Sequence, residues 1–179
     1  MRDHGSSILH GVVIATTNYG EADTIVTLYT KEKGKITAIA KGARKLTSRK
    51  RSSLMLFSKI SLSCAETKGM WIIREAKIVN SFEEIRVNLT KVSLAYFFCE
   101  VTKKITPEHT PQPEIYDLLS KALARLEHTK NLKFLKNAFI KRILDYSGFT
   151  IDSSLDPTTL LNEVLERELG SVRVGKMIQ

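Results

Sequence analysis

The hydrophobic pattern of the chain changes its period near Asn80. Before this residue, apolar side chains alternate with polar ones at every second position, which is typical of β-strands. After it, apolar side chains recur at three- and four-residue spacing, which is typical of amphipathic helices. The 179 residues are enough for one large or two small domains. The pattern therefore predicts an α+β protein, with a strand-rich domain in residues 1–80 and an all-α domain in residues 81–179.

Five runs in the first half have the composition of short strands: residues 8–17, 24–30, 35–40, 56–65 and 70–79. In the second run, Val26 and Leu28 fall on one face and the residues between them on the other. Glycine-containing turns separate several of the runs. Five short strands in so few residues suit a small closed barrel, because closure removes the exposed edges of a sheet.

Four helices are predicted in the second half: residues 88–105, 113–125, 132–146 and 158–169. Pro113 and Pro157 stand at the start of two of them, where proline is tolerated, and glycines end two. In the first helix, the spacing predicts a wide apolar face and hence a mostly buried helix. The residues near one face are Leu89, Val92, Tyr96, Cys99 and Lys103, and Leu94, Phe97, Phe98 and Val101 widen it. We expect the balanced charges of this half to form a solvated outer surface.

The stretch from Lys31 to Arg51 carries most of the positive charge. It holds nine basic side chains and one acidic one, so its charge of +8 is nearly the whole chain's formal +9. Such a density of cations repels itself unless a polyanion neutralises it, and nucleic acid is the commonest polyanion. The small residues between the cations allow a backbone to approach a phosphate closely. The sequence isoelectric point near 9.6 also favours an anionic partner, with nucleic acid first and a membrane surface second.

Within this stretch, residues 41–45 and 48–51 (KGARK and SRKR) form the strongest motif. They follow a predicted strand, so they are expected to form a loop that directs arginine and lysine side chains at a phosphate backbone. A solvated charged loop, or a localisation tract, is the alternative. The one-sided charge favours phosphate binding.

Four aromatic residues of the first half are candidate platforms on which nucleic-acid bases stack: Tyr19, Tyr29, Phe57 and Trp71. Barrels that bind single strands often use ring faces in this way. For any one ring, however, a place in the core is the more frequent outcome. Tyr19, which precedes Gly20, is the ring that we expect to be exposed.

The sequence contains no recognisable catalytic constellation. Its four histidines lie in unrelated contexts, and none pairs with a nucleophile at a known spacing. Gly42 lacks the neighbours of a nucleotide-binding loop. A nucleic-acid enzyme is therefore the weaker hypothesis, and no metal site or cofactor is predicted.

The two cysteines, Cys64 and Cys99, both lie in apolar contexts. They are expected to be buried thiols in a reducing cytoplasm, and they do not have the spacing of a zinc site. No apolar run approaches the roughly 18 residues that span a bilayer. The N-terminus lacks the pattern of a signal peptide.

Several segments together resemble the RecO family of bacterial recombination mediators. They are residues 11–13 (GVV), 19–30 (YGEADTIVTLYT), 34–35 (GK), 40–45 (AKGARK), 48–49 (SR) and 139–149 (FIKRILDYSGF). The combination of residues 19–30 with residues 40–45 is specific, whereas neither would suffice alone. The resemblance covers nearly the whole chain and is strongest in residues 11–51.

This resemblance implies an N-terminal OB-fold barrel followed by a helical domain. It implies binding of single- and double-stranded DNA, annealing of complementary strands, and loading of the RecA recombinase in the repair of damaged DNA and the SOS response. The implied partners are RecR and the acidic, apolar C-terminal tail of single-strand-binding protein, in the bacterial cytoplasm at the nucleoid. No enzymatic activity or cofactor is implied. The matching DNA-contacting positions are Lys35, Lys41, Arg44, Lys45 and Arg49, with Lys50 and Arg51 by proximity, and Tyr19 is the candidate stacking residue.

The chain departs from the family pattern after Gly148. Many members carry a cysteine-rich, often zinc-binding module there, but this chain passes from Ser153 to Asp156 without a cysteine. The segment 164–170 still resembles the family's last helix. The expectation is a shortened module without zinc.

Three alternatives to a DNA-binding mediator remain open. OB-folds also bind RNA, and nothing in the sequence separates the two nucleic acids. A nucleic-acid enzyme is the second alternative. The third is a scaffold that docks an acidic peptide where basic residues adjoin Phe134 and Phe139; a solvated helix face explains these residues equally well. The basic residues concerned are Lys133, Lys136, Lys141 and Arg142.

Overall fold

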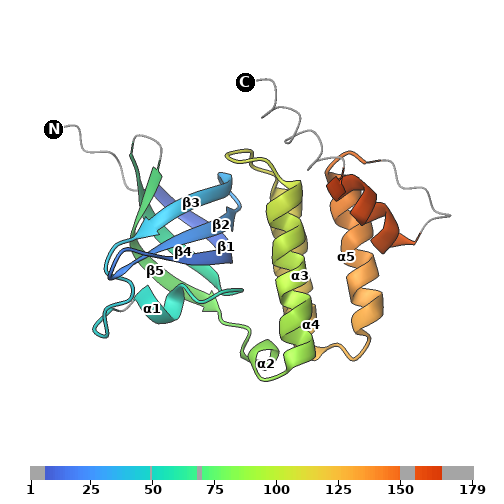
Figure 1. Cartoon of the computed structure of the whole chain (residues 1–179), viewed down its shortest axis with the longest axis horizontal. Helices are drawn as coiled ribbons and strands as arrows, with labels where there is room; N and C mark the ends of the chain where they lie inside the picture. Colours follow the sequence, from blue (N-terminus) through green and yellow to red (C-terminus); the bar gives the residue numbers. More distant parts are fainter. Residues whose placement is uncertain (1–6, 49, 68–69, 150–155, 167–179) are drawn as a thin grey trace.

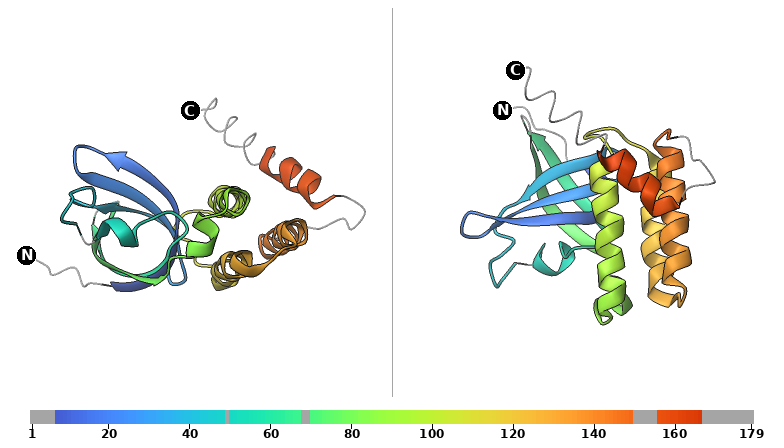
Figure 2. Two further views of the ribbon diagram at one scale, coloured as in Figure 1. Left: turned by 90° about the horizontal axis from the view of Figure 1, so that it is seen from below. Right: turned by 45° about the vertical axis from the view of Figure 1, so that its right-hand side comes forward.

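A computed structural model describes residues 7–48, 50–67, 70–149 and 156–166. A β-barrel formed by the N-terminal half stands beside a group of upright helices formed by the C-terminal half (Figure 1). Figure 2 shows the same two layers from two other directions, with the helices on one side of the barrel. The predicted α+β class is therefore confirmed. No helix in the described part of the chain is long and apolar enough to cross a membrane.

The barrel is closed, with strand order β1-β2-β3-β5-β4. The pairs are antiparallel except for β3 and β5, which run parallel. A short helix, α1 (Lys50–Ser53), lies between β3 and β4. This is the five-stranded Greek-key arrangement of an OB-fold, as expected. The strands are β1 (Ser7–Tyr19), β2 (Asp23–Thr30), β3 (Gly34–Ala40), β4 (Lys59–Thr67) and β5 (Met70–Asn80).

Alternation along the strands fills the barrel interior. Val26 and Leu28 of β2 are buried inside, together with Ile36 of β3 and Leu62 of β4. Because the side-chain period of a strand is two, the residues between them face outward. Some of these outward residues are nevertheless buried, because the helices cover that part of the barrel wall.

Two of the longer helices begin at an asparagine cap. The side chain of Asn88 accepts a hydrogen bond from the amide of Lys91, and that of Asn131 accepts one from Phe134. Such caps satisfy amides that have no partner within the helix. Residues 157–166 are also helical; the rest of the predicted fourth helix, 167–169, lies outside the described residues. The longer helices are α3 (Leu89–Ile105), α4 (Pro113–His128) and α5 (Leu132–Tyr146), and a short α2 (Glu83–Arg86) precedes them.

The buried face of α3 is only partly the predicted one. Leu94, Phe98 and Cys99 are buried, as predicted. Leu89 and Tyr96, which were expected on the same face, are 85% and 55% exposed. The helix has apolar residues on most sides, so spacing alone does not decide its orientation. Its position between the barrel and the helices α4 and α5 decides which side is covered.

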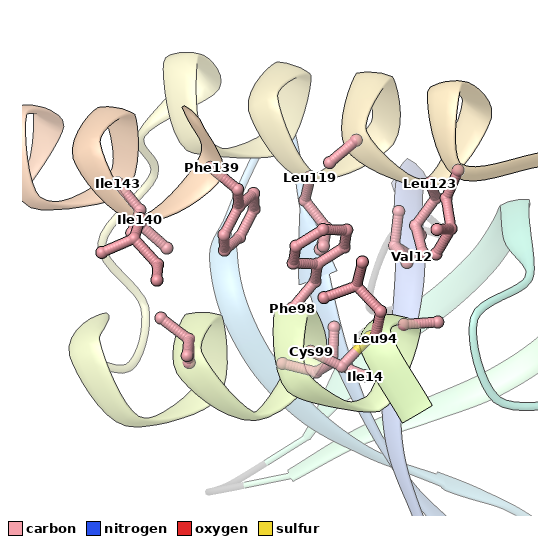
Figure 3. Close-up of a cluster of buried hydrophobic side chains, with 14 of the residues drawn as sticks. Val12, Ile14, Leu94, Phe98, Cys99, Leu119, Leu123, Phe139, Ile140 and Ile143 are labelled. Carbon is pink, nitrogen blue, oxygen red and sulfur yellow. The ribbon is translucent and has the colours of Figure 1, made fainter. Parts of the chain in front are cut away.

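One apolar core joins the barrel wall to the helices. Val12 and Ile14 of β1 point away from the barrel interior and pack against Leu94 and Phe98 of α3 and Leu119 and Leu123 of α4 (Figure 3). Tyr29 of β2 and Phe57 belong to the same cluster. The strand half and the helical half are therefore packed together through side chains of both.

The connector between α3 and α4 lies against the start of β3. His109 donates its amide hydrogen to the carbonyl of Lys35 at 2.9 Å, and Lys35 pairs with Glu108 as an isolated β-bridge. Gly34 has a left-handed backbone (φ 67°), and a Cβ there would collide with the carbonyl of Thr110. Glycine is required at this position for both reasons.

Candidate nucleic-acid interface

The basic loop, residues 41–48 after β3, lies against the turn between β1 and β2. The carboxylate of Asp23 accepts a hydrogen bond from the amide of Gly42 at 2.7 Å. The amide of Arg44 donates to the carbonyl of Ala22 at 2.9 Å, and its guanidinium Nη1 donates to the carbonyl of Gly20 at 3.1 Å. These three contacts hold two segments distant in sequence as one unit at the barrel rim.

Five amides of the loop are already bonded within the protein. The amides of Gly42 and Arg44 are bonded as described, and those of Ala43, Lys45 and Ser48 donate to carbonyls within the loop and its base. A phosphate-binding nest needs free amides that converge on one point. These five amides are therefore not available to a phosphate, and the exposed side chains carry the positive charge that the loop presents.

Four predicted contact residues present exposed cations on this rim: Lys41, Arg44, Lys45 and Arg51. Tyr19 is 54% exposed on the adjoining turn. We call these five residues the basic surface. Arg51 is connected to the rest because it lines a shallow groove with Ser48, whose amide donates to the carbonyl of Lys45 at 3.0 Å. Glu21 is an exposed acidic neighbour, so the surface is predominantly, but not wholly, cationic.

Lys50 is placed differently from these residues. Its ammonium donates to the carbonyl of Ile73 on β5 at 2.9 Å, and the side chain is half-buried. This hydrogen bond connects α1 to β5, and it makes the ammonium of Lys50 less available to an external ligand. Arg49 lies outside the described residues.

Lys35 does not reach the basic surface at all. The residue is only 9% exposed, and its ammonium donates to the carbonyls of Lys103 at 2.8 Å and Thr106 at 2.6 Å. Both carbonyls belong to the C-terminal end of α3, where a cation also complements the helix dipole. Desolvation lowers the pKa of Lys35, while Glu108, at 3.8 Å, opposes this shift. Its role is to join the barrel to α3.

The remaining aromatic residues of the barrel are core residues. Tyr29, Phe57 and Trp71 are all buried, and the hydroxyl of Tyr29 donates to the carbonyl of Gln112 at 3.5 Å. Tyr19 is thus the exposed ring among the four, as expected. The sequence patterns did not identify Asp23, whose carboxylate accepts a hydrogen bond from the basic loop. An acidic residue that follows a glycine-containing turn is the signal that indicates such a role.

A second candidate site is a groove of about 530 Å³ between α4 and α5. The exposed ring of Phe134 and the buried ring of Phe139 contribute its apolar part. Of the four basic residues noted from the sequence, Arg142 lines it, whereas the ammonium of Lys136 lies 4.7 Å from the ring centroid of Phe97. The charged lining consists of Lys121, Arg125, Arg142, Glu114 and Asp117.

The two cysteines are free and buried, as predicted. Burial raises the pKa of the Cys64 thiol to about 12 and raises that of Cys99 as well. Within the described residues, no three histidine, cysteine or acidic side chains come together in a way that could hold a metal ion.

Comparison with known proteins agrees with both halves of the structure. The family model described as "Recombination protein O N terminal" matches residues 6–82, and "Recombination protein O C terminal" matches residues 86–156.

Similar curated proteins include three that are named DNA repair protein RecO. The protein of Myxococcus xanthus is 37% identical over 117 residues, which is 65% of this chain and 48% of the relative. That of Geobacter metallireducens is 32% identical over 151 residues (84% and 61%), and that of Listeria monocytogenes is 30% identical over 138 residues (77% and 54%). The aligned region thus spans about half the length of these relatives.

Proposed function

Because this chain belongs to the RecO family of DNA repair and recombination proteins, we propose that it is a non-enzymatic, DNA-binding mediator. It would anneal complementary strands and help load a recombinase onto DNA coated with single-strand-binding protein. The proposed location is the bacterial cytoplasm, at the nucleoid. The observation that carries the proposal is the basic surface: four exposed cations and one exposed aromatic ring on the rim of an OB-type barrel.

Charge neutralisation gives this surface a means to promote annealing. Two complementary strands repel each other through their phosphates, and each phosphate contact with lysine or arginine releases condensed counterions. Cations that are fixed on a rigid rim would lower this repulsion for two strands at once. OB-folds bind oligonucleotides on the face of strands 2 and 3 and through the loops β1–β2 and β4–β5, and the basic surface adjoins the first of these loops.

The experiment is an annealing assay with complementary DNA strands coated with cognate single-strand-binding protein, in the absence of ATP. The wild-type chain is expected to accelerate annealing at low and moderate salt. The triple variant Lys41→Ala, Lys45→Ala, Arg51→Ala is expected to lose this effect. Arg44 is left in place because its guanidinium also holds the neighbouring turn.

The matched control is the triple variant Lys103→Ala, Lys104→Ala, Lys130→Ala. It removes the same charge from exposed positions of the helical half and is expected to anneal DNA like the wild type. Equal loss in both variants would mean that net charge, rather than the basic surface, is responsible. No acceleration by the wild type would contradict the mediator function itself.

RNA binding is the alternative, since an OB-fold accommodates both nucleic acids. Competition between DNA and RNA oligonucleotides of the same sequence discriminates the two. A preference for DNA supports the mediator, whereas a preference for RNA favours an RNA-binding module without mediator activity.

The groove between α4 and α5 is the proposed site for the C-terminal tail of single-strand-binding protein. An acidic, apolar tail suits Lys121, Arg125 and Arg142 beside Phe134. Substituting Arg125 and Phe134 by alanine is expected to weaken binding of a fluorescent tail peptide without changing DNA binding. RecR is a further proposed partner, on family membership alone.

A further inference from the structure

The most exposed large apolar side chain of the basic loop is Leu46, which is 92% exposed. A single exposed leucine needs no explanation on most surfaces. This one follows Arg44 and Lys45 directly, and two further exposed apolar side chains lie on the same rim. Tyr19 is on the adjoining turn, and Met55 lines the shallow groove with Ser48 and Arg51.

The loop is anchored to the barrel before Leu46 and forms a hydrogen-bonded turn around it. Before it, Gly42 is bonded to Asp23 and Arg44 to Gly20 and Ala22. After it, the amide of Ser48 donates back to the carbonyl of Lys45 at 3.0 Å. An apolar side chain held in solvent on an anchored loop loses little further conformational freedom when a ligand covers it.

We propose that Leu46, flanked by Tyr19 and Met55, contacts unstacked bases, and so gives the basic surface a preference for single strands over duplex. This inference rests on the proposed function, because it assumes that DNA binds at the basic surface. The charge of the surface indicates the ligand. It must carry negative groups, such as phosphates, to neutralise the cations Lys41, Arg44, Lys45 and Arg51. It must also carry exposed apolar faces beside these groups, to cover the apolar side chains.

A single strand has this chemistry and a duplex does not. In a single strand, the base faces are accessible next to the phosphates, and aromatic side chains stack on them with little sequence preference. An apolar side chain beside such a ring covers further base surface and removes it from water. In a duplex the bases are stacked, and an apolar wedge reaches them only by unstacking a step, which costs energy.

The test compares Leu46→Ala with the wild type in the full chain. Dissociation constants are measured over a range of salt concentrations for a DNA single strand of about 16 nucleotides, the upper site size of an OB-fold, and for the duplex of the same length. We expect about three- to tenfold weaker binding of the single strand, an unchanged salt slope, and little change for the duplex. The slope stays constant because no phosphate contact is removed.

Leu89→Ala is the matched control, because Leu89 is a similarly exposed leucine (85%) at the start of α3, and it is expected to leave both affinities unchanged. Unchanged single-strand binding by Leu46→Ala, or equal losses for single strand and duplex, would overturn the inference.

The triple cation variant separates the two proposals. If its salt slope equals that of the wild type, DNA does not bind at the basic surface and both proposals fail. If its slope falls while Leu46→Ala behaves like the wild type, only this inference fails.

Discussion

At the scale of single residues, Lys35 and Lys41 show how neighbouring cations on one strand and its loop take different roles. Both belong to the same basic stretch of sequence. Lys35 faces the C-terminal end of α3 and is buried, whereas Lys41 follows the strand and is exposed. The total charge of the stretch can be counted from the sequence. Which lysine is buried and which is exposed cannot, because the burial of Lys35 depends on contacts with residues about 70 positions away.

Replacing Lys35 by methionine is expected to destabilise the fold and leave DNA binding unchanged. Two carbonyls at the end of α3 would lose their donor, which costs about 1–3 kcal/mol when the groups are buried. Urea unfolding measures this loss, and Lys31→Met, at an exposed position, serves as the control. A reduced salt slope of DNA binding in Lys35→Met would instead place this lysine on the interface.

The buried thiol of Cys64 has a consequence for pH dependence. Burial raises its pKa from an ordinary 9.0 to about 12, so the folded state holds the proton more tightly than the unfolded state. The stability linked to the neutral thiol is therefore present below pH 9.0 and is lost as the pH rises towards about 12. A thiol reagent at mildly alkaline pH is expected to modify the protein only after denaturant is added. Rapid modification of the native protein would contradict the buried position.

At the scale of elements, the orientation of the basic loop depends on Asp23. Its carboxylate accepts a hydrogen bond from the amide of Gly42, so Asp23→Ala removes one of the three contacts that hold the loop and leaves a partly buried amide without its acceptor. Asp23→Asn retains an acceptor of similar shape. We expect Asp23→Ala to bind DNA a few-fold more weakly and Asp23→Asn to bind as well as the wild type or better, since it removes a negative charge. Fluorescence anisotropy with labelled DNA measures both; weaker binding by Asp23→Asn alone would contradict the assignment.

Element boundaries were predictable where local chemistry determines them. The helix from Leu132 to Tyr146 has the predicted bounds, and Asn131 caps it. The strand alternation separated Val26 and Leu28, which face the barrel interior, from the residues between them. The buried face of α3 was predicted only in part, because packing against both the barrel and the other helices determines which side of this helix is covered.

At the scale of the whole molecule, the two halves share a core, although the sequence pattern divides them near Asn80. Val12, Ile14 and Tyr29 belong to the barrel but are covered by helices. Alternation predicts that they face outward, yet it does not indicate what covers them. The packing of the helices against the barrel also determines which cations remain exposed to a ligand. Only part of the candidate interface could therefore be predicted from the sequence.

The shared core predicts that the barrel and the helices unfold together. The single tryptophan, Trp71, lies in the barrel, so its fluorescence reports on that half, whereas far-ultraviolet circular dichroism is dominated by the helices. Coincident urea transitions from the two probes are expected. Separate midpoints would mean that residues 1–80 and 81–179 behave as independent domains.

The connector between α3 and α4 has a consequence for how this chain can vary. Surface connections usually accept insertions, because their backbone contacts little else. The connector between α3 and α4 is instead paired with β3 through His109 and Glu108, and the carbonyl of Thr110 lies in close contact with Gly34. An inserted residue would shift the pairing and uncover the edge of a strand, which is a template for association with other chains. Among homologous sequences, length changes should therefore be rarer in this connector than its position on the surface suggests.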